Sequence, residues 1–328
     1  MKLLLSLIKI FPAEASHYIA LFSLKVIYKI GLIGLISRKF NKADRVIQFG
    51  YEFENSLGIA AGLDKNGDYF DALGALGFGF IEVGTVTPLP QPGNQKPRLF
   101  RLFSEDAIIN KLGFNNKGID YLVNRLKKRK YKGIIGVNIG ANKTSDAFQR
   151  IDDYVQCYKK ICKLSDYVTI NISSPNTPNL RDLHSEENIV SLLSALKDSR
   201  KKININKPIF IKISPDEKLE VIEMIVSKVK QFNISGLIVS NTTIDKTILK
   251  DKSYNAIEGG LSGKPIFKKS TRLIKDIKQM DSTIKIIGVG GVISKSDFKN
   301  KIDAGSELVQ IYTGFILKGP NIISELLD

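Results

Sequence analysis

Polar side chains follow several short apolar runs of the sequence, and their types suit a reaction on a planar ring that forms hydrogen bonds. Amides and hydroxyls both donate and accept hydrogen bonds, and a lysine supplies a fixed cation. A single Asn or Lys in such a place is well explained as a capped strand end or a solvated side chain. Several in the same relative position are hard to explain by structure alone. They end the runs at Lys65, Thr85, Asn138, Asn171, Lys212 and Ser240-Asn241-Thr242.

Three glycine-rich segments give a second chemical signal. They are Gly259-Gly260-Leu261-Ser262-Gly263, Gly288-Val289-Gly290-Gly291 and Tyr312-Thr313-Gly314. Glycine lets backbone amides approach phosphate oxygens, and a following helix N-terminus adds a positive field. The glycines could simply form turns, but segments of this kind at neighbouring strand ends favour a phosphate site.

The elements that must position these groups alternate along the chain. Short apolar runs occupy residues 57–61, 80–84, 134–139, 167–172, 209–213, 236–240, 284–289 and 308–312. Longer amphipathic stretches lie between them, such as residues 68–76, 146–164, 185–202, 218–232 and 267–279. Near-continuous apolar strands followed by helices indicate a parallel sheet covered on its faces. The pattern therefore predicts a (β/α)8 TIM barrel, whose active groups gather at the C-terminal ends of the strands.

One long insertion, residues 88–116, follows the second predicted strand and is rich in Pro, Gly and Asn. We expect it at the catalytic mouth, where the loops of such barrels carry function. Lys212 and the two strand-end asparagines suit a ring that must accept negative charge. A lysine beside the pyrimidine part of a flavin stabilises its anionic reduced form. No GxGxxG segment opens a βαβ unit, so a nicotinamide dinucleotide is not the first candidate.

The N-terminal segment has a different pattern. Apolar residues recur at helical spacing in two stripes: Leu3, Leu7 and Ile10, then Leu21, Leu24, Ile27 and Tyr28. Pro12 separates two predicted helices, and Ser16 is a candidate cap for the second. Lysines interrupt the apolar run, so neither a membrane span nor a secretory signal is expected. We predict an N-terminal helical domain over residues 1–40 that lies in a membrane interface or packs on the barrel of residues 41–328.

The stretch Asn171-Ile172-Ser173-Ser174-Pro175-Asn176-Thr177-Pro178 makes the interpretation specific. With Ala61-Gly62-Leu63-Asp64-Lys65, Ile109-Asn110-Lys111-Leu112-Gly113-Phe114-Asn115-Asn116 and Ser240-Asn241-Thr242-Thr243, it resembles dihydroorotate dehydrogenase. The resemblance covers the whole chain and includes Pro12-Ala13-Glu14-Ala15-Ser16-His17, which is similar to the N-terminal helical domain of the class that uses membrane quinone. The soluble classes lack this extension and have cysteine where Ser174 stands. Both differences point to the quinone-reducing class.

This resemblance implies the oxidation of (S)-dihydroorotate to orotate in de novo pyrimidine biosynthesis. Ser174 would be the base that takes the C5 proton, while C6 gives a hydride to N5 of FMN. A serine is a poor base at its ordinary pKa, so it needs a relay to water or an activating neighbour. Thr177 and the loop amides are both candidates for that role.

The resemblance also implies the two binding sites. FMN would be held by Ala61, Gly62, Leu63, Asp64, Lys65, Thr85, Asn138, Asn171, Lys212, Ser240, Gly263, Gly291, Tyr312 and Thr313. Dihydroorotate would be held by Lys65, Asn110, Lys111, Leu112, Gly113, Phe114, Asn115, Asn171, Asn176, Asn241 and Thr242. A small anionic pyrimidine needs a cation and several amides, which agrees with this set.

A membrane quinone would reoxidise the flavin through an apolar tunnel formed by the N-terminal helices. His17 and Arg101 match family positions that line the quinone site. The protein is then expected to act as a monomer bound peripherally to the cytoplasmic side of the cell membrane. Two positions depart from the family: Ser240 stands where threonine is usual and keeps the hydroxyl, and Asn179 stands where glycine is usual, which could alter loop mobility over the substrate.

Charge and cysteine content bear on the alternatives. The formal net charge is +16, but the basic residues are spread along the chain, which is typical of a solvated surface. A flavin barrel that reduces uridine in tRNA would need a catalytic cysteine and an RNA-binding domain. Cys157 and Cys162 end no predicted strand, and with two distant histidines they indicate no disulfide framework or metal site. A membrane-binding module with an inert barrel predicts random residue types at the strand ends, and the residue types found there are not random.

Overall fold

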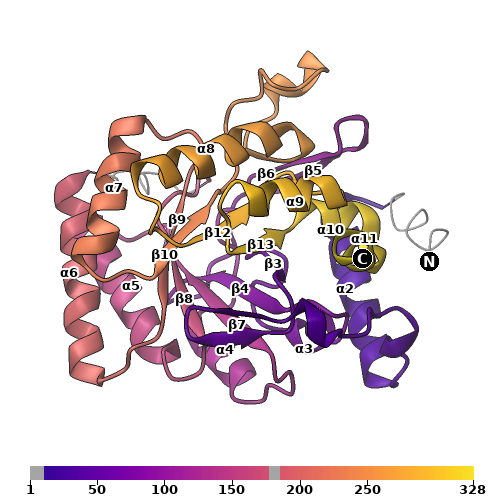
Figure 1. Cartoon of the computed structure of the whole chain (residues 1–328), viewed down its shortest axis with the longest axis horizontal. Helices are drawn as coiled ribbons and strands as arrows, with labels where there is room; N and C mark the ends of the chain where they lie inside the picture. Colours follow the sequence, from indigo (N-terminus) through magenta and orange to yellow (C-terminus); the bar gives the residue numbers. More distant parts are fainter. Residues whose placement is uncertain (1–10, 177–184) are drawn as a thin grey trace.

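Eight parallel strands close into a barrel at the centre of the molecule (Figure 1). The computed structural model describes residues 11–176 and 185–328. Around the barrel the strands follow the order β10-β12-β13-β3-β4-β7-β8-β9. They are β3 (Leu57–Ile59), β4 (Phe80–Val86), β7 (Ile134–Ile139), β8 (Tyr167–Asn171), β9 (Ile209–Ile213), β10 (Gly236–Val239), β12 (Ile286–Val289) and β13 (Leu308–Ile311). The predicted (β/α)8 fold and all eight predicted strands are confirmed.

Helices cover the outside of the barrel. They are α3 (Phe70–Gly74), α4 (Ile119–Leu126), α5 (Ala147–Ile161), α6 (Glu186–Ile203), α7 (Leu219–Gln231), α8 (Phe267–Met280), α9 (Lys295–Asp303), α10 (Thr313–Lys318) and α11 (Ile322–Leu327). The five predicted helices are all present among them, as α3, α5, α6, α7 and α8. Helix α5 illustrates why they form. Asp146 and Gln149 make a reciprocal capping box at its start, and Tyr154, Cys157 and Ile161 bury one face.

A short hairpin that the sequence pattern did not predict closes the N-terminal end of the barrel. It consists of β1 (Val46–Gln48) and β2 (Tyr51–Phe53), paired antiparallel. The ring of Phe53 contacts that of Phe80, with 5.5 Å between ring centroids. Phe49, in the turn, contacts Phe210 at 4.8 Å. These edge-to-face aromatic contacts fill the floor of the barrel and leave its opposite end for the site.

The long insertion after β4 folds into an antiparallel sheet rather than an irregular loop. Its strands β5 (Leu99–Leu102) and β6 (Ala107–Asn110) pair with each other, and β6 also pairs with β11 (Gly260–Gly263). Part of the first glycine-rich segment is therefore a strand. The insertion stands over the C-terminal ends of the barrel strands, as predicted.

Helix α2 (Ala13–Lys29) lies on the opposite side of the barrel from α5, α6 and α7 (Figure 1). It packs against α3 and β5 with Leu21 and Leu24 buried. The prediction that Ser16 caps this helix is wrong. Pro12 is the N-cap, and Ser16 lies within the first turns, where its hydroxyl donates to the carbonyl of Phe11 at 3.1 Å. The first predicted helix falls outside the described residues.

No helix among residues 11–176 and 185–328 is long and apolar enough to cross a membrane.

Candidate active site

A cavity of about 970 Å³ opens at the C-terminal ends of the barrel strands, and we call it the central cavity. Most of the predicted flavin and substrate residues line it, although they come from distant parts of the chain. They are Ala61, Gly62, Lys65, Thr85, Asn110, Leu112, Gly113, Phe114, Asn171, Ser174, Asn176, Lys212, Ser240, Asn241, Thr242, Gly263, Gly291, Tyr312 and Thr313. Ser174, Lys65 and Lys212 thus share one cavity, which the predicted chemistry requires.

Five predicted residues do not line the central cavity. Leu63 lines an adjacent cavity, and the Lys111 ammonium lies 3.4 Å from the Glu258 carboxylate. Asp64 accepts hydrogen bonds from the amides of Asp68 and Tyr69, at 2.8 and 2.7 Å. Burial raises the pKa of Asp64 to about 6 against those hydrogen bonds. This carboxylate therefore shapes the turn before α3. Asn115 also lies outside the central cavity and lines a third, polar cavity.

The fifth, Asn138, lies behind the wall of the central cavity in a buried network. It accepts a hydrogen bond from Thr85 Oγ1 at 2.6 Å and donates to Glu82 at 2.9 Å. Thr85 in turn accepts from Asn171 Nδ2 at 3.1 Å. The buried network fixes the side chains of Thr85 and Asn171, so Asn138 acts on the site through them.

Glu82 and Gln310 belong to the same network and were not among the predicted site residues. Both are fully buried, and Gln310 Nε2 donates to Glu82 Oε2 at 2.8 Å. Gln310 also lines the central cavity, and its Oε1 has no hydrogen-bond partner in the described part of the chain. Each is a polar residue inside an otherwise apolar strand, and the sequence shows this. The prediction considered only residues at the ends of strands and therefore missed both.

Two lysines set the electrostatics of the central cavity. Burial lowers the pKa of Lys212, and the charge of Glu82 opposes this effect. Lys65 donates to the carbonyl of Gly62 at 2.8 Å, and burial together with the charge of Arg98 lowers its pKa to about 8. Within the described segments, neither ammonium group forms an ion pair with a carboxylate, so both are available to an anionic ligand.

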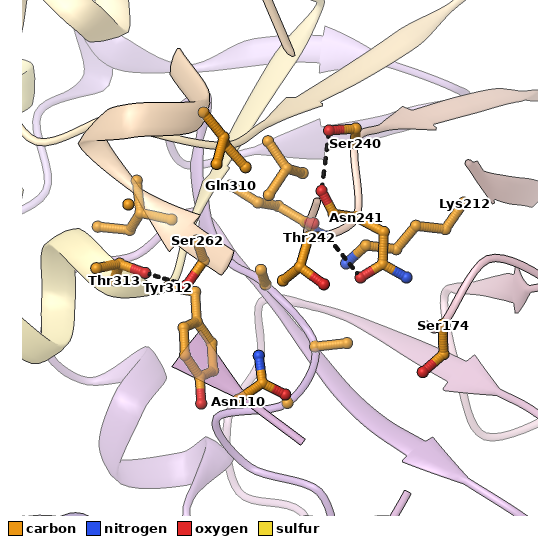
Figure 2. Close-up of a pocket in the computed structure, with 18 of the residues that line it drawn as sticks. Asn110, Ser174, Lys212, Ser240, Asn241, Thr242, Ser262, Gln310, Tyr312 and Thr313 are labelled. Atoms are coloured by element: carbon orange, nitrogen blue, oxygen red, sulfur yellow. Dashed lines mark hydrogen bonds between the residues drawn. The ribbon is translucent and has the colours of Figure 1, made fainter. Parts of the chain in front are cut away.

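The predicted base lies on the loop after β8 (Figure 2). Ser174 is 6% exposed, and its Oγ accepts a hydrogen bond from the amide of Asn176 at 3.3 Å. The Asn176 side chain donates to Asn110 at 3.3 Å, which links this loop to the insertion. Thr177, His184 and Asn179 lie outside the described residues.

The glycine-rich segments meet on the opposite side of the central cavity. Gly263 and Gly291 have φ values of 100° and 78°, in the left-handed region that favours glycine. A Cβ on Gly291 would come within 2.5 Å of Phe267 Cβ. Ser262 belongs to the first glycine-rich segment but was not among the individually predicted flavin residues, and its Oγ lies 2.8 Å from Thr313 Oγ1 (Figure 2). Hydroxyls and backbone amides at this place suit a phosphate group.

A second cavity of about 1060 Å³, the apolar cavity, lies between α2, the β5–β6 hairpin and α10. His17 and Arg101, the two predicted quinone-site residues, both line it. Arg101 Nη1 donates to Ser16 Oγ at 3.2 Å. Apolar side chains form most of the remaining wall: Ala13, Ala20, Leu21, Leu24, Ile27, Ile36, Leu63, Leu99, Phe103, Ile108, Phe315 and Ile316.

His17 is neutral at physiological pH. Burial and the charge of Lys65 lower its pKa to about 4, against a hydrogen bond with the backbone of Leu63 and the charge of Glu14. A neutral imidazole suits an apolar site that receives an uncharged ligand.

Consecutive residues separate the two cavities. Gly62 lines the central cavity, and Leu63 lines the apolar cavity. The same holds at the other wall, where Gly314 faces the central cavity and Phe315 the apolar one. A single layer of chain thus divides the central cavity from the apolar cavity.

The two cysteines take no part in either cavity. Cys157 and Cys162 are buried in and just after α5, and burial raises the pKa of both thiols.

Comparison with known proteins agrees with this geometry. The family profile described as "Dihydroorotate dehydrogenase" matches residues 45–328. A "Dihydroorotate dehydrogenase (quinone)" of Coxiella burnetii (strain Dugway 5J108-111) is 46% identical over 321 residues, which is 96% of this chain and 92% of the relative. The protein of the same name from Saccharophagus degradans is 44% identical over 96% of this chain and 94% of its own length. A crystal structure of DHODH from Eimeria tenella in complex with ferulenol superposes with a TM-score of 0.87 at 32% identity, over 96% of this chain and 89% of that one. The family match covers most of the chain and the relatives cover nearly all of it, and the chain therefore belongs to the dihydroorotate dehydrogenase family.

Proposed function

We propose that this chain oxidises (S)-dihydroorotate to orotate in pyrimidine biosynthesis, with FMN in the central cavity and a membrane quinone in the apolar cavity. Membership of the family makes the chain an oxidoreductase with a flavin cofactor. The observation that carries the two-site proposal is the arrangement of Gly62 and Leu63. These neighbours line different cavities, so a polar and an apolar reactant approach the same loop from opposite sides.

The central cavity fits a flavin mononucleotide. Gln310 presents a buried oxygen without a partner in the described residues, and Lys212 presents a buried ammonium group without a carboxylate. A ring system with hydrogen-bond donors and a site of developing negative charge would satisfy both. When bound, a flavin supplies hydride acceptance from an organic substrate and electron transfer to a quinone.

Each wall residue has a proposed part in holding the cofactor. Lys212, Asn171, Thr85 and Gln310 would hold the ring, with Asn138 fixing Thr85 from behind. Ala61, Gly62, Lys65 and Ser240 would border it, and Leu63 and Asp64 would hold the same loop in shape. Gly263, Gly291, Tyr312 and Thr313 would surround the phosphate, together with Ser262. Fixed dipoles and a fixed cation need no reorganisation when charge develops, which lowers the barrier.

The substrate would lie between the flavin ring and the loop that carries Ser174. The Ser174 hydroxyl would take the C5 proton, and the buried surroundings keep competing water away. Asn110, Asn176, Asn241 and Thr242 supply hydrogen-bonding groups for the pyrimidine, and Lys65 supplies a cation for its carboxylate. Leu112, Gly113 and Phe114 would close the insertion over the ring. The backbone of Lys111 would contribute to the same segment, since its side chain faces Glu258.

The apolar cavity would receive the quinone ring beside His17 and Arg101. Arg101 would supply a cation to a carbonyl oxygen of the quinone, and the neutral His17 would offer a ring nitrogen without the desolvation cost of a second charge. Helix α2 forms one side of this cavity, so a molecule that enters along α2 reaches Leu63 directly.

The proposed division of the chain is an N-terminal quinone and membrane domain of residues 1–40 and a catalytic barrel of residues 41–328. The family match begins at residue 45, after α2, which supports it. Large apolar side chains on and after α2 are exposed, among them Phe22 at 63%, Ile30 at 61% and Leu35 at 80%. They would enter the interface on the cytoplasmic side of the cell membrane, with the protein as a monomer.

Anaerobic mixing with dihydroorotate tests this function directly. The purified protein should be yellow, and its flavin absorbance should bleach on mixing. Ser174→Ala should slow the bleaching by a factor of about 10²–10⁴ with the flavin content unchanged. Ser174→Cys keeps an ionisable group at this position and should retain part of the rate. A protein without flavin would contradict the function, and full-speed bleaching of Ser174→Ala would remove Ser174 as the base.

A further inference from the structure

Lys301 is a fully buried lysine that the proposed reaction does not use. It lies in α9 with 0% of its surface exposed. Its ammonium group donates to Ser270 Oγ at 2.6 Å and to the carbonyl of Val289 at 3.5 Å. It also lies 5.4 Å from the centroid of the Phe267 ring. All three partners are uncharged, although burial of an ammonium ion is costly without a counter-charge.

The nearest carboxylate is already engaged. Asp297 lies one turn before Lys301 in α9, and its Oδ1 is 2.7 Å from the Lys264 ammonium. Its other oxygen accepts a hydrogen bond from the amide of Ile293 at 3.2 Å. Lys264 lies over the same Phe267 ring, at 5.2 Å from the centroid. Two lysines and one carboxylate therefore surround Phe267 among the described residues, which leaves positive charge in excess.

The partners of Lys301 form the underside of the loop after β12. Ser270 Oγ, which accepts from Lys301, itself donates to the carbonyl of Gly290 at 3.1 Å. Val289, Gly290 and Gly291 all line the central cavity. Phe267, at the start of α8, packs so closely against Gly291 that no side chain fits there. Lys301 thus lies directly behind the backbone of the proposed phosphate site.

We infer that Lys301 is the buried counter-charge of the flavin phosphate and that it makes the central cavity select phosphorylated flavin over riboflavin. This inference rests on the proposed function, because it takes the phosphate to lie at Gly290 and Gly291. Lys301 acts through the loop as a specificity-determining residue. The excess positive charge that is costly in the empty protein becomes favourable when a phosphate dianion lies on the other side of the loop.

Flavin binding to the apoprotein separates this role from a merely structural one. Wild-type apoprotein should bind FMN far more tightly than riboflavin, as measured by the change in flavin fluorescence. Lys301→Met should weaken FMN binding by on the order of 10- to 100-fold and leave riboflavin binding within about twofold of wild type. Equal losses for both flavins, or no loss for FMN, would overturn the inference. A wild-type apoprotein that binds neither flavin would instead contradict the proposed function itself.

Lys299→Met is the matched control. It removes an identical charge from the exposed side of the same helix and should leave the FMN-to-riboflavin affinity ratio unchanged.

A measurement on the wild-type protein alone keeps the inference testable if Lys301→Met folds poorly. Burial lowers the pKa of Lys301 to about 7 against the charge of Asp297, and a phosphate is already a dianion at pH 8.

FMN binding at pH 8 should therefore cause more proton uptake than riboflavin binding does. Binding of either flavin would change proton uptake by Lys65 in the same way, so the difference between the two flavins does not contain it. Calorimetry in buffers of different ionisation enthalpy measures this difference, and equal uptake for the two flavins would refute the role of Lys301. Among residues 11–176 and 185–328, the charged groups around Lys301 are Asp297 in α9 and Lys264 just before α8, and its polar and ring contacts are to neutral Ser270, Phe267 and Val289.

Discussion

Arg98 joins the helix that lines the apolar cavity to the insertion that covers the central cavity, through an ion pair with Glu14. Arg98 Nη2 lies 2.7 Å from Glu14 Oε1, and the two side chains are only 7% and 15% exposed. The other arm of the guanidinium donates to the carbonyls of Pro92 and Asn94, at 2.6 and 2.9 Å. Asn94 Nδ2 then donates to the carbonyl of Asn176, two residues from Ser174, at 3.2 Å. Every step of this path is a hydrogen bond between described residues.

Replacing Arg98 should therefore impair both halves of the reaction. Arg98→Met leaves the Glu14 carboxylate with only the Lys96 ammonium, at 3.9 Å, and we expect a loss of roughly 1–3 kcal/mol in the free energy of unfolding. Although Arg101 still donates to Ser16, this link between α2 and the insertion is lost, so the KM for dihydroorotate and the KM for quinone should both rise. Steady-state kinetics with each substrate varied in turn, beside chemical denaturation, measures these effects.

Arg272→Met is the matched control for this replacement. Arg272 also forms an ion pair, with Asp276 at 2.7 Å, but its side chain is 76% exposed on α8. An exposed pair contributes little to stability, so both KM values and the unfolding free energy should stay close to wild type. If Arg98→Met raised neither KM, the two cavities would be independent of this contact.

The pKa of His17 predicts how stability depends on pH. Burial and the charge of Lys65 lower this pKa from 6.5 to about 4. The unfolded chain therefore binds a proton at His17 between pH 6.5 and 4, and the folded protein does not. The stabilising contribution is present above pH 6.5 and is lost as pH falls toward 4, at most about 3 kcal/mol in all.

His17→Asn should flatten this part of the profile, because asparagine does not titrate. Denaturant unfolding at steps between pH 7 and pH 4 measures the difference between the two proteins. The carboxylates still contribute to acid denaturation in both, so the wild-type minus variant difference is the quantity to follow. A difference that stays constant across this range would mean that folding leaves the pKa of His17 unchanged.

The barrel could be predicted because its strands are compact apolar runs, most of which end in a polar residue. Periodicity and strand-end chemistry therefore located the barrel and most of the central cavity. The β5–β6–β11 sheet could not be found in this way. Residues 107–110 pair with residues 260–263, and no local pattern encodes such a distant partner.

The misplaced details have local physical reasons. Ser16 suits a cap by its residue type, but the helix already begins after Pro12, four residues earlier. Glu82 lies in mid-strand rather than at a strand end. Its buried carboxylate accepts hydrogen bonds from Gln310, Tyr167 and Thr169, and the sequence alone does not show that these residues lie near it. Such networks depend on neighbours from other strands.

Filling the apolar cavity should block quinone reduction alone. Ala20 lies on α2 and lines this cavity, whereas Ala15 is exposed on the same helix. Ala20→Trp places an indole in the space proposed for the quinone, so steady-state turnover with quinone should fall by about 10-fold or more, as expected when a pocket loses its ligand contacts. Flavin bleaching by dihydroorotate in a single turnover should be unchanged.

Ala15→Trp adds the same bulk outside the cavity and should spare both reactions. Equal quinone turnover in Ala20→Trp and wild type would exclude the apolar cavity as the quinone site.

The exposed apolar residues of the N-terminal segment should control membrane binding. Phe22 and Leu35 are 63% and 80% exposed, and burial of each in lipid is worth about 1.5–3 kcal/mol. The double variant Phe22→Gln, Leu35→Gln should therefore bind vesicles of anionic and zwitterionic lipid at least about tenfold more weakly in a flotation assay.

Phe148→Gln is the control, since Phe148 is 86% exposed at the start of α5, on the far side of the barrel from α2 (Figure 1). Turnover with a detergent-dispersed quinone should remain in both variants, because neither Phe22 nor Leu35 lines the apolar cavity. Vesicle binding that survives in the double variant, or is lost equally in Phe148→Gln, would show that the protein meets the membrane through another surface.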